Sequence, residues 1–295
     1  MLRIGIDIGG TSAKLGLVDM DGRVLSRVQV PTGREMTADD LVTTLSDAIF
    51  GRLEGHKAAG LGIAAPGMRR EDGEGVINVT NLPHIDGYPL RERMQEATGL
   101  RTVVDNDANA AAMGEARFGG GRGAERLLVM TLGTGIGAGM VVDGQVHRVS
   151  WQGLGDPGHV IVQRNGPPCG CGGHGCVETI AAVPALLRKA AEAGLPDATF
   201  GDMVIAARCG NTAVSEILQE GGAWIGMALA TLVHVFGPDR ILLGGGGVDA
   251  AKELLFEPIR ESLFAHTQPF LAERLTLGRA ALGNDAGLVG AAALF

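Results

Sequence analysis

Three of the four cysteines are concentrated in the short stretch CGCGGHGCVE. Cys169, Cys171 and Cys176 are two and five residues apart, a spacing that suits thiolate ligands of zinc. A disulfide is less favourable, because Cys169 and Cys171 are too close to pair easily and any pair leaves one thiol over. A tetrahedral zinc site needs a fourth ligand, which either His159 upstream or His174 within the stretch could supply. We therefore expect a structural zinc that pins this glycine-rich segment; three incidental thiols are the alternative.

A group of polar residues lies where an apolar strand runs into an alanine-rich helix, in VVDNDANAAA. The group contains Asp105, Asn106 and Asp107. Phosphoryl transfer needs positioning, charge neutralisation and an acceptor for the hydroxyl proton. A carboxylate beside a helix N-terminus stays ionised at neutral pH, so Asp107 could orient a substrate hydroxyl and take its proton. Asp is also a frequent N-cap, and the three residues could share capping and catalysis.

Three glycine-rich loops could hold phosphate groups or a nucleoside through bare backbone. The first offers Gly9, Gly10 and Thr11, with Asp7 before it and Lys14 after it; the second offers Gly133, Thr134 and Gly135; the third offers Gly245 and Gly246. Asp7 is the natural Mg²⁺ contact, through water, unless it is only a turn or cap residue. Lys14 could bind phosphate or face solvent. None of the loops is a Walker A motif, but three together indicate a bound nucleotide.

The elements that must position these residues alternate between strands and helices, which indicates an α/β architecture. LRIGIDIGG is typical of a buried strand that ends in glycines, and Asp21-Gly22 is typical of a hairpin turn. The helical patterns include residues 37–55, closed by Gly55, and residues 212–236.

An internal repeat relates two parts of the chain. Residues 127–146 repeat the order of residues 2–24: a strand, a Gly/Thr loop, a second strand and an Asp-Gly turn into a third. We interpret the repeat as two related halves and expect a ligand cleft between them. The alternative is a chance likeness of two glycine-rich hairpins.

Charge and composition exclude several classes of protein. The 295 residues carry a formal net charge of −8 and no long basic run, which argues against nucleic acid as a partner. No basic leader with an apolar segment is visible, and no apolar run reaches about 18 residues, the length of a membrane span. We therefore expect a cytoplasmic protein without a membrane partner.

Taken together, the motifs resemble the ROK family of sugar kinases and repressors over nearly the whole chain. DIGGTSAKLGLVD and LGTGIGAGMVVDGQ are similar to the two phosphate motifs of the family, and DNDANAAAMGE is similar to its catalytic segment. AAPG and NLPHIDGYPL resemble its sugar-side segments, and GDPGH followed by CGCGGHGCVE resembles its zinc and sugar signature. LLGGGG and LGNDAGLVGAA match its adenosine strand and closing helix.

The resemblance implies two actin-like (ribonuclease H-like) lobes with a cleft between them. The N-terminal lobe would span residues 1–117, with the helix at 284–295 packing back on it, and the C-terminal lobe with the zinc loop would span 118–283. It also implies a glucokinase-like activity: ATP-dependent phosphorylation of a hydroxyl of a hexose or hexose derivative, with Mg²⁺ and a structural Zn²⁺. Similar kinases are usually homodimers, and we expect a homodimer or homotetramer here. Repressor members carry an N-terminal DNA-binding domain, which we do not expect in a chain that begins at the first strand.

The family resemblance also assigns roles to residues, with Asp107 as the base. The positions that hold the sugar are Gly67, Asn81, Asn106, Asp107, Asp156, His159 and Glu178. His159 would bind zinc through one ring nitrogen, beside the three cysteines, and offer the other to the sugar.

One departure from the family pattern concerns the sugar. The family usually has Glu where this chain has Asp156, followed by Pro157. A hydroxyl that Glu reaches could be missed, met through water, or replaced by a bulkier substituent. An N-acyl hexosamine or polyol kinase, and a non-catalytic sugar sensor, are therefore alternatives. Polyphosphate as donor is a weaker one, since the glycine-rich adenosine strand argues against it.

Overall fold

The computed structural model describes residues 1–52, 57–149 and 153–295, and it divides into two compact units. The first unit contains Met1–Ala124, Gly139–Gly155 and Asn284–Phe295. The second contains Glu125–Ala138 and Asp156–Gly283. Strands and helices alternate in both, which confirms the predicted α/β class. Within the described residues, no helix has both the length and the apolar character needed to cross a membrane.

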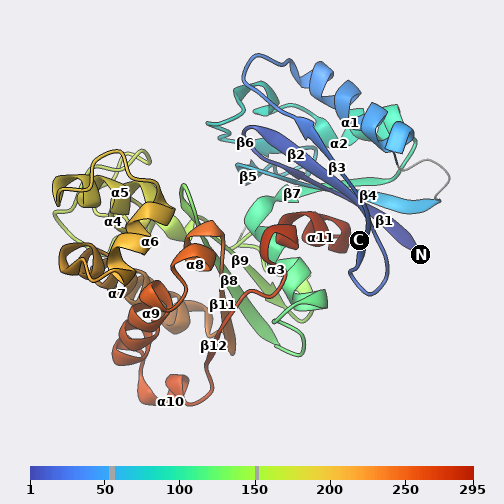
Figure 1. Cartoon of the computed structure of the whole chain (residues 1–295). Helices are drawn as coiled ribbons and strands as arrows, with labels where there is room; N and C mark the ends of the chain where they lie inside the picture. Colours follow the sequence, from blue (N-terminus) through green and yellow to red (C-terminus); the bar gives the residue numbers. More distant parts are fainter. Residues whose placement is uncertain (53–56, 150–152) are drawn as a thin grey trace. The chain divides into compact units, whose positions relative to one another are not determined.

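The first unit is built on a five-stranded sheet with the order β3-β2-β1-β4-β7 (Figure 1). The first three strands pair antiparallel, whereas β1, β4 and β7 are parallel neighbours. The predicted turn at Asp21-Gly22 joins the second and third strands. The strands are β1 (Leu2–Ile8), β2 (Ser12–Val18), β3 (Val24–Pro31), β4 (Ala58–Ala65) and β7 (Thr102–Asn106).

Helices cover both faces of this sheet. They are α1 (Ala38–Arg52), α2 (Leu90–Thr98), α3 (Asp107–Phe118) and α11 (Ala286–Ala293), with a short hairpin of β5 (Met68–Arg69) and β6 (Val76–Ile77) and 3-10 turns at Pro83–Ile85 (η1) and Gly283–Asp285 (η3). A capping box opens α1, since Thr37 and Asp40 exchange backbone-to-side-chain hydrogen bonds. The end predicted for this helix at Gly55 lies outside the described residues.

Helix α11 approaches the sheet closely because three glycines line up beneath it. Gly16, Gly5 and Gly62 are register partners across β2, β1 and β4. A Cβ on Gly5 would lie 2.0 Å from the carbonyl oxygen of Leu288, and one on Gly62 would lie 1.8 Å from that of Ala291. Any larger residue would therefore push the helix away. This close approach carries the C-terminal helix onto β1, the strand that contains Asp7.

The opposite face of the sheet carries the hydrophobic core. Ile4 and Ile6 alternate with Gly5 along β1, so they point away from α11 and pack with Leu41 and Leu45 of α1. All four side chains are buried. Each such burial stabilises the fold by about 1.5–3 kcal/mol, so this layer fixes the strand ends from which the site residues project.

The second sheet has the order β10-β9-β8-β11-β12, which repeats the order β3-β2-β1-β4 of the first sheet. As in the first sheet, the first two strands in this order pair antiparallel and the fourth is parallel to the third. The predicted internal repeat is thus present in the strand order. The strands are β8 (Arg126–Leu132), β9 (Ile136–Val142), β10 (Gln145–Val146), β11 (Arg240–Gly244) and β12 (Thr276–Arg279).

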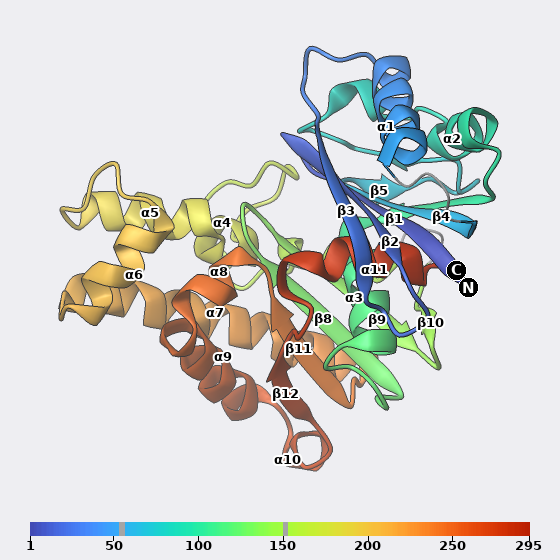
Figure 2. The same ribbon diagram turned by 45° about the vertical axis from the view of Figure 1, so that its right-hand side comes forward.

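The second unit is rich in helices: α4 (Val177–Ala181), α5 (Val183–Glu192), α6 (Phe200–Arg208), α7 (Thr212–Phe236), α8 (Gly246–Ala251), α9 (Glu253–His266), α10 (Pro269–Ala272) and the 3-10 turn η2 (Pro157–His159). Helix α7 agrees with the predicted helix at 212–236. Asn211 caps its start through a hydrogen bond from the Val214 N–H, and Gly237 ends it with a left-handed backbone. Helices α7 and α9 run side by side (Figure 2), in contact at Gly222 and Gly226.

Candidate functional site

The first glycine loop follows β1 in the first unit and is fixed by Thr32. The Thr32 hydroxyl donates a hydrogen bond to the Gly9 carbonyl (2.6 Å), and its N–H donates to the Thr11 carbonyl (3.0 Å). A Cβ on Gly10 would lie 3.7 Å from the Cβ of Asn81, so the structure brings the phosphate loop and a predicted sugar contact together. Asn81 itself is exposed.

Asp7 is the penultimate residue of β1 and lies next to this loop in the chain. Burial raises the pKa of Asp7, and the positive charge of Lys14 acts in the opposite direction. The Lys14 ammonium group donates to the Asn284 carbonyl at 3.2 Å. Lys14 thus ties β2 to the turn before α11 while it remains close enough to stabilise the Asp7 carboxylate.

Asn106 holds three predicted residues of the first unit in one cluster. As the N-cap of α3, its side-chain oxygen accepts hydrogen bonds from Ala108 N–H and Asn109 N–H. Its amide nitrogen donates to the Gly67 carbonyl and to the Asp107 carboxylate, both at 2.8 Å. The capping role considered from the sequence therefore belongs mainly to Asn106. The Asp107 carboxylate accepts the Ala108 N–H as well and remains exposed to solvent.

The environment of Asp107 favours a proton acceptor that works near neutral pH. The side chain is solvent-accessible, but the dense surrounding protein withdraws it from bulk water and raises its pKa to about 6. Hydrogen bonds from Ala108 N–H and the Asn106 amide oppose this shift, while the nearby Asp7 carboxylate adds to it. A carboxylate with this pKa is mostly ionised at pH 7 and still basic enough to take a proton.

Asp105 is a buried acid to which the sequence analysis assigns no separate role. It accepts hydrogen bonds from the Asn106 N–H and from the Asn109 amide, and it forms an ion pair with Arg148. Only 1% of its side chain is exposed, so the pairing is required to keep the charge buried. A charged residue inside an apolar strand signals such a partner, but nothing in the sequence identifies Arg148, 43 residues away.

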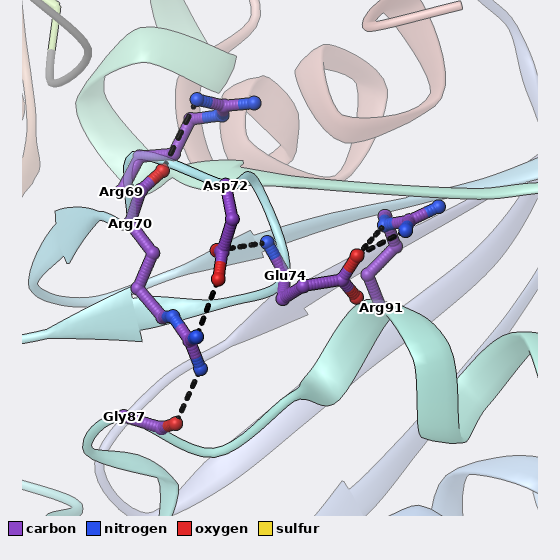
Figure 3. A network of polar contacts seen from close by, with 6 residues as sticks. All are labelled: Arg69, Arg70, Asp72, Glu74, Gly87 and Arg91. Carbon is purple, nitrogen blue, oxygen red and sulfur yellow. Dashed lines mark hydrogen bonds and ion pairs between the residues drawn. The ribbon is translucent and has the colours of Figure 1, made fainter.

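The segment between Gly67 and Asn81 is held by a polar network on the β5–β6 hairpin (Figure 3). Arg91 of α2 forms an ion pair with Glu74, and Arg70 donates to the Gly87 carbonyl at 2.6 Å. Asp72 accepts from the Glu74 N–H at 2.9 Å and pairs with Arg70. The network fastens the hairpin to α2 and so fixes the segment that carries both predicted sugar contacts.

The second glycine loop, in the second unit, is organised by Glu178. The Glu178 carboxylate accepts the Ile136 N–H at 2.9 Å, and a Cβ on Gly135 would come within 2.5 Å of the same oxygen. The Gly133 carbonyl accepts the N–H of Val183, the first residue of α5. Thr134 and Glu178 line a cavity of about 450 Å³, together with Arg188 of α5. The loop and a predicted sugar contact are thus adjacent.

The third glycine loop follows β11. Gly245 has a left-handed backbone (φ 88°), and a Cβ there would lie 2.5 Å from the Leu132 carbonyl oxygen at the end of β8. Gly246 is the first residue of α8, and a Cβ on it would meet nothing within 4 Å. Strand β11 thus ends at Gly244, and the later glycines of this run open a helix.

The ligand atoms of His159, Cys169, Cys171 and Cys176 all lie within 4.8 Å of one another. For Zn–S bonds near 2.3 Å, tetrahedral geometry places neighbouring sulfurs about 3.8 Å apart. The sulfurs of Cys171 and Cys176 are 3.7 Å apart, and the Cys169 sulfur is 3.3 Å from Nδ1 of His159. The donor set therefore fits zinc, and it selects His159 over the exposed His174 as the fourth member.

The pKa values of two of these thiols differ from the ordinary value of cysteine. Burial, with the neighbouring thiols adding to it, raises the pKa of Cys176 to about 12, whereas a hydrogen bond from the Gly173 N–H leads the effects that lower the pKa of Cys171. A dication among the sulfurs would favour the thiolate form of all three.

Asp156 and Glu178 lie beside the metal cluster. The Asp156 carboxylate is 3.3 Å from Nε2 of His159. Burial raises the pKa of Asp156; His159 opposes this shift and Glu178 adds to it. The nitrogen of His159 that was expected to face the sugar thus has Asp156 beside it. The structure brings Asp156, His159 and Glu178 together in the second unit, as it does Asp7, Gly67, Asn106 and Asp107 in the first.

The chain is similar to known proteins over nearly its whole length. The sequence model of the ROK family matches residues 3–295. The chain is 36% identical to a glucokinase of Streptomyces coelicolor, over 99% of this chain and 97% of that protein. A solved ROK family glucokinase of Streptomyces griseus, in complex with glucose and AMPPNP, has a TM-score of 0.84 and 36% identity and covers 100% of this chain and 99% of its own.

A second solved structure, the ROK hexokinase of Thermus thermophilus, has a TM-score of 0.89 at 33% identity and covers 100% of this chain and 97% of its own. These likenesses confirm the predicted α/β fold with two actin-like lobes. The cleft that the fold implies stays a prediction.

Proposed function

Because the chain belongs to the ROK family, we propose that it is an ATP-dependent kinase that phosphorylates a hydroxyl of a hexose or hexose derivative. Its full-length likeness to glucokinases supports this activity, as does the likeness to a kinase solved with glucose and an ATP analogue. The lobes are proposed at residues 1–117, with 284–295, and at 118–283. The first compact unit differs from the first lobe because it also contains the residues up to Ala124 and Gly139–Gly155.

The observation that carries the proposal is the position and the raised pKa of Asp107. Its carboxylate lies at the N-terminus of α3, accepts a hydrogen bond from Asn106 and has a pKa of about 6. In the proposed reaction, Asp107 orients the sugar hydroxyl and takes its proton as the oxygen attacks the terminal phosphorus. The bond from that phosphorus to the leaving oxygen breaks, and ADP departs.

The glycine loops would hold the nucleotide. Gly9, Gly10 and Thr11 in the first unit, and Gly133, Thr134 and Gly135 in the second, offer backbone N–H groups and hydroxyls to phosphate oxygens. Gly245 and Gly246 would let adenosine lie against bare backbone. Asp7 would hold Mg²⁺ through water, supported by the positive charge of Lys14.

The sugar would contact Gly67, Asn81, Asn106, Asp156, His159 and Glu178. A structural zinc on His159 and the three cysteines would anchor the loop that carries the last of these contacts, and Mg²⁺ would neutralise charge on the transferred phosphoryl group. We also propose a cytoplasmic homodimer or homotetramer, which light scattering on the purified protein would test.

The direct test is an assay of ADP formation with a panel of glucose, mannose, N-acylated hexosamines and polyols. We expect hexose-dependent ADP release well above the ATPase background. When polyphosphate replaces ATP, we expect less sugar phosphate to form, measured directly as that product. Nucleotide binding without ADP release for any member of the panel would contradict the kinase proposal and favour a sugar sensor.

A further inference from the structure

Asp156 and His159 are placed on one face of a short 3-10 turn. Asp156 is the residue before the turn and His159 is its last residue, and side chains three residues apart eclipse each other in this geometry. Pro157 occupies the first position, where its fixed φ suits the turn. The His159 N–H also donates to the Asp156 carbonyl at 3.0 Å. The backbone therefore presents the carboxylate to the imidazole ring.

The two ring nitrogens of His159 face different partners. Nδ1 is 3.3 Å from the Cys169 sulfur and belongs to the metal cluster, whereas Nε2 is 3.3 Å from the Asp156 carboxylate. A nitrogen that binds a metal cannot carry a proton, so the proton must then be on Nε2. A proton on Nε2 then lies on the side of the ring that has the Asp156 carboxylate within ion-pair distance.

The 3-10 turn also packs against β9, so the placement of Asp156 beside His159 does not depend on the metal alone. A Cβ on Gly158 would lie 2.2 Å from the Ile136 carbonyl oxygen, which shows how closely the turn packs on the start of β9. Asp156 makes no capping hydrogen bond with its side chain. Its carboxylate is therefore available to His159.

We propose that Asp156 is a positioning residue for the metal ligand His159, and that it fixes the ring orientation and the Nε2–H tautomer. This inference rests on the zinc site of the proposed function. Outer carboxylates of this kind typically change metal affinity by about 10–100-fold when they are removed. A Glu at this position would carry its carboxylate one methylene further from the backbone, so the pairing is a property of Asp in this chain.

The experiment compares zinc affinity in the full-length wild type, Asp156→Ala, Asp156→Asn and the control Glu216→Gln, which removes an exposed charge from α7 of the same unit. Zinc is stripped, the protein is titrated with zinc against a competing chelator, and bound metal is quantified. We expect about 10–100-fold weaker binding for Asp156→Ala, a smaller loss for Asp156→Asn, whose amide oxygen still accepts, and no change for the control.

Two further readouts separate positioning from a general structural role. The stripped forms of wild type and Asp156→Ala should unfold at the same urea concentration. Long-range ¹H–¹⁵N spectra of the zinc-free wild type should show the His159 proton on Nε2, whereas zinc-free Asp156→Ala should populate both tautomers. Wild-type zinc affinity in Asp156→Ala, or a proton on Nδ1, would overturn the inference. A wild type that binds no zinc would overturn the metal site as well, while sugar-dependent ADP release tests the kinase activity independently.

Discussion

The carboxylate of Asp7 lies against Gly287, in the first turn of α11. A Cβ on Gly287 would come within 2.6 Å of the Asp7 carboxyl carbon and within 2.8 Å of both oxygens. The Asp7 carboxylate, which is proposed to contact Mg²⁺, therefore has room at this place because residue 287 has no side chain. The closing helix of the chain thus shapes the site at the end of its first strand.

We predict that Gly287→Ala displaces Asp7 or α11. The overpacking should destabilise the protein by about 1–3 kcal/mol and should raise the KM for Mg-ATP more than the KM for sugar. Urea unfolding and steady-state kinetics measure the two effects. Gly33→Ala is the matched control, since a Cβ at Gly33 meets nothing within 4 Å. Equal behaviour of the two variants would contradict the role given to Gly287.

The pKa of about 6 for Asp107 sets the expected pH dependence. A base works only when ionised, so kcat/KM should rise with pH, about tenfold per unit below pH 6, and reach a plateau above it. Because the Asp7 carboxylate contributes to raising the pKa of Asp107, Asp7→Asn should move the midpoint of its residual activity to lower pH. A pH–rate profile measures both. A midpoint that stays in place in Asp7→Asn would show that the titrating group is not Asp107.

The zinc cluster predicts a coupling between metal content and sugar affinity. Cys171→Ser removes one of the four ligands, so the protein should lose zinc and the KM for sugar should rise at least about tenfold. Metal analysis and kinetics on the same preparation are the measurements. Cys209→Ser is the control, because Cys209 is exposed and lies outside the cluster. Normal sugar kinetics in a zinc-free Cys171→Ser would refute the coupling.

The hairpin network predicts an effect on sugar binding alone. Arg91→Met leaves Glu74 without its ion pair and loosens the segment between Gly67 and Asn81. The pair is partly exposed, so we expect a loss of about 1 kcal/mol, which is roughly fivefold in the KM for sugar. The KM for ATP should not change. Glu96→Gln, on the same helix but paired with Arg93 and not with the hairpin, is the control and should leave both KM values unchanged.

Local signals in the sequence were sufficient for much of the fold. Asn211 and Gly237 mark both ends of α7 because capping chemistry is local. Strand-ending glycines marked the loops after β1 and β8 for the same reason. By contrast, Gly5 is visible in the sequence, but its partner Leu288 is not, since their contact depends on tertiary packing.

In the candidate site too, local features could be predicted from the sequence and long-range contacts could not. The residue types and spacing of the cysteine cluster left both His159 and His174 open as the fourth ligand. The family resemblance pointed to His159, and the structure places that residue with the three cysteines. Asp107 was identified from its place before a helix, whereas the capping role of Asn106 depends on hydrogen bonds that only the folded chain shows. The pairing of Asp105 with Arg148 could not be predicted, because long-range ion pairs leave no local pattern.

The central claim is that Asp107 acts as the base of sugar phosphorylation. The most direct measurement is kcat of Asp107→Asn with the best sugar substrate, alongside the affinity of the variant for ATP. We predict that kcat falls by about 10²–10⁴-fold while ATP binds as in wild type. Turnover equal to that of wild type would contradict the account.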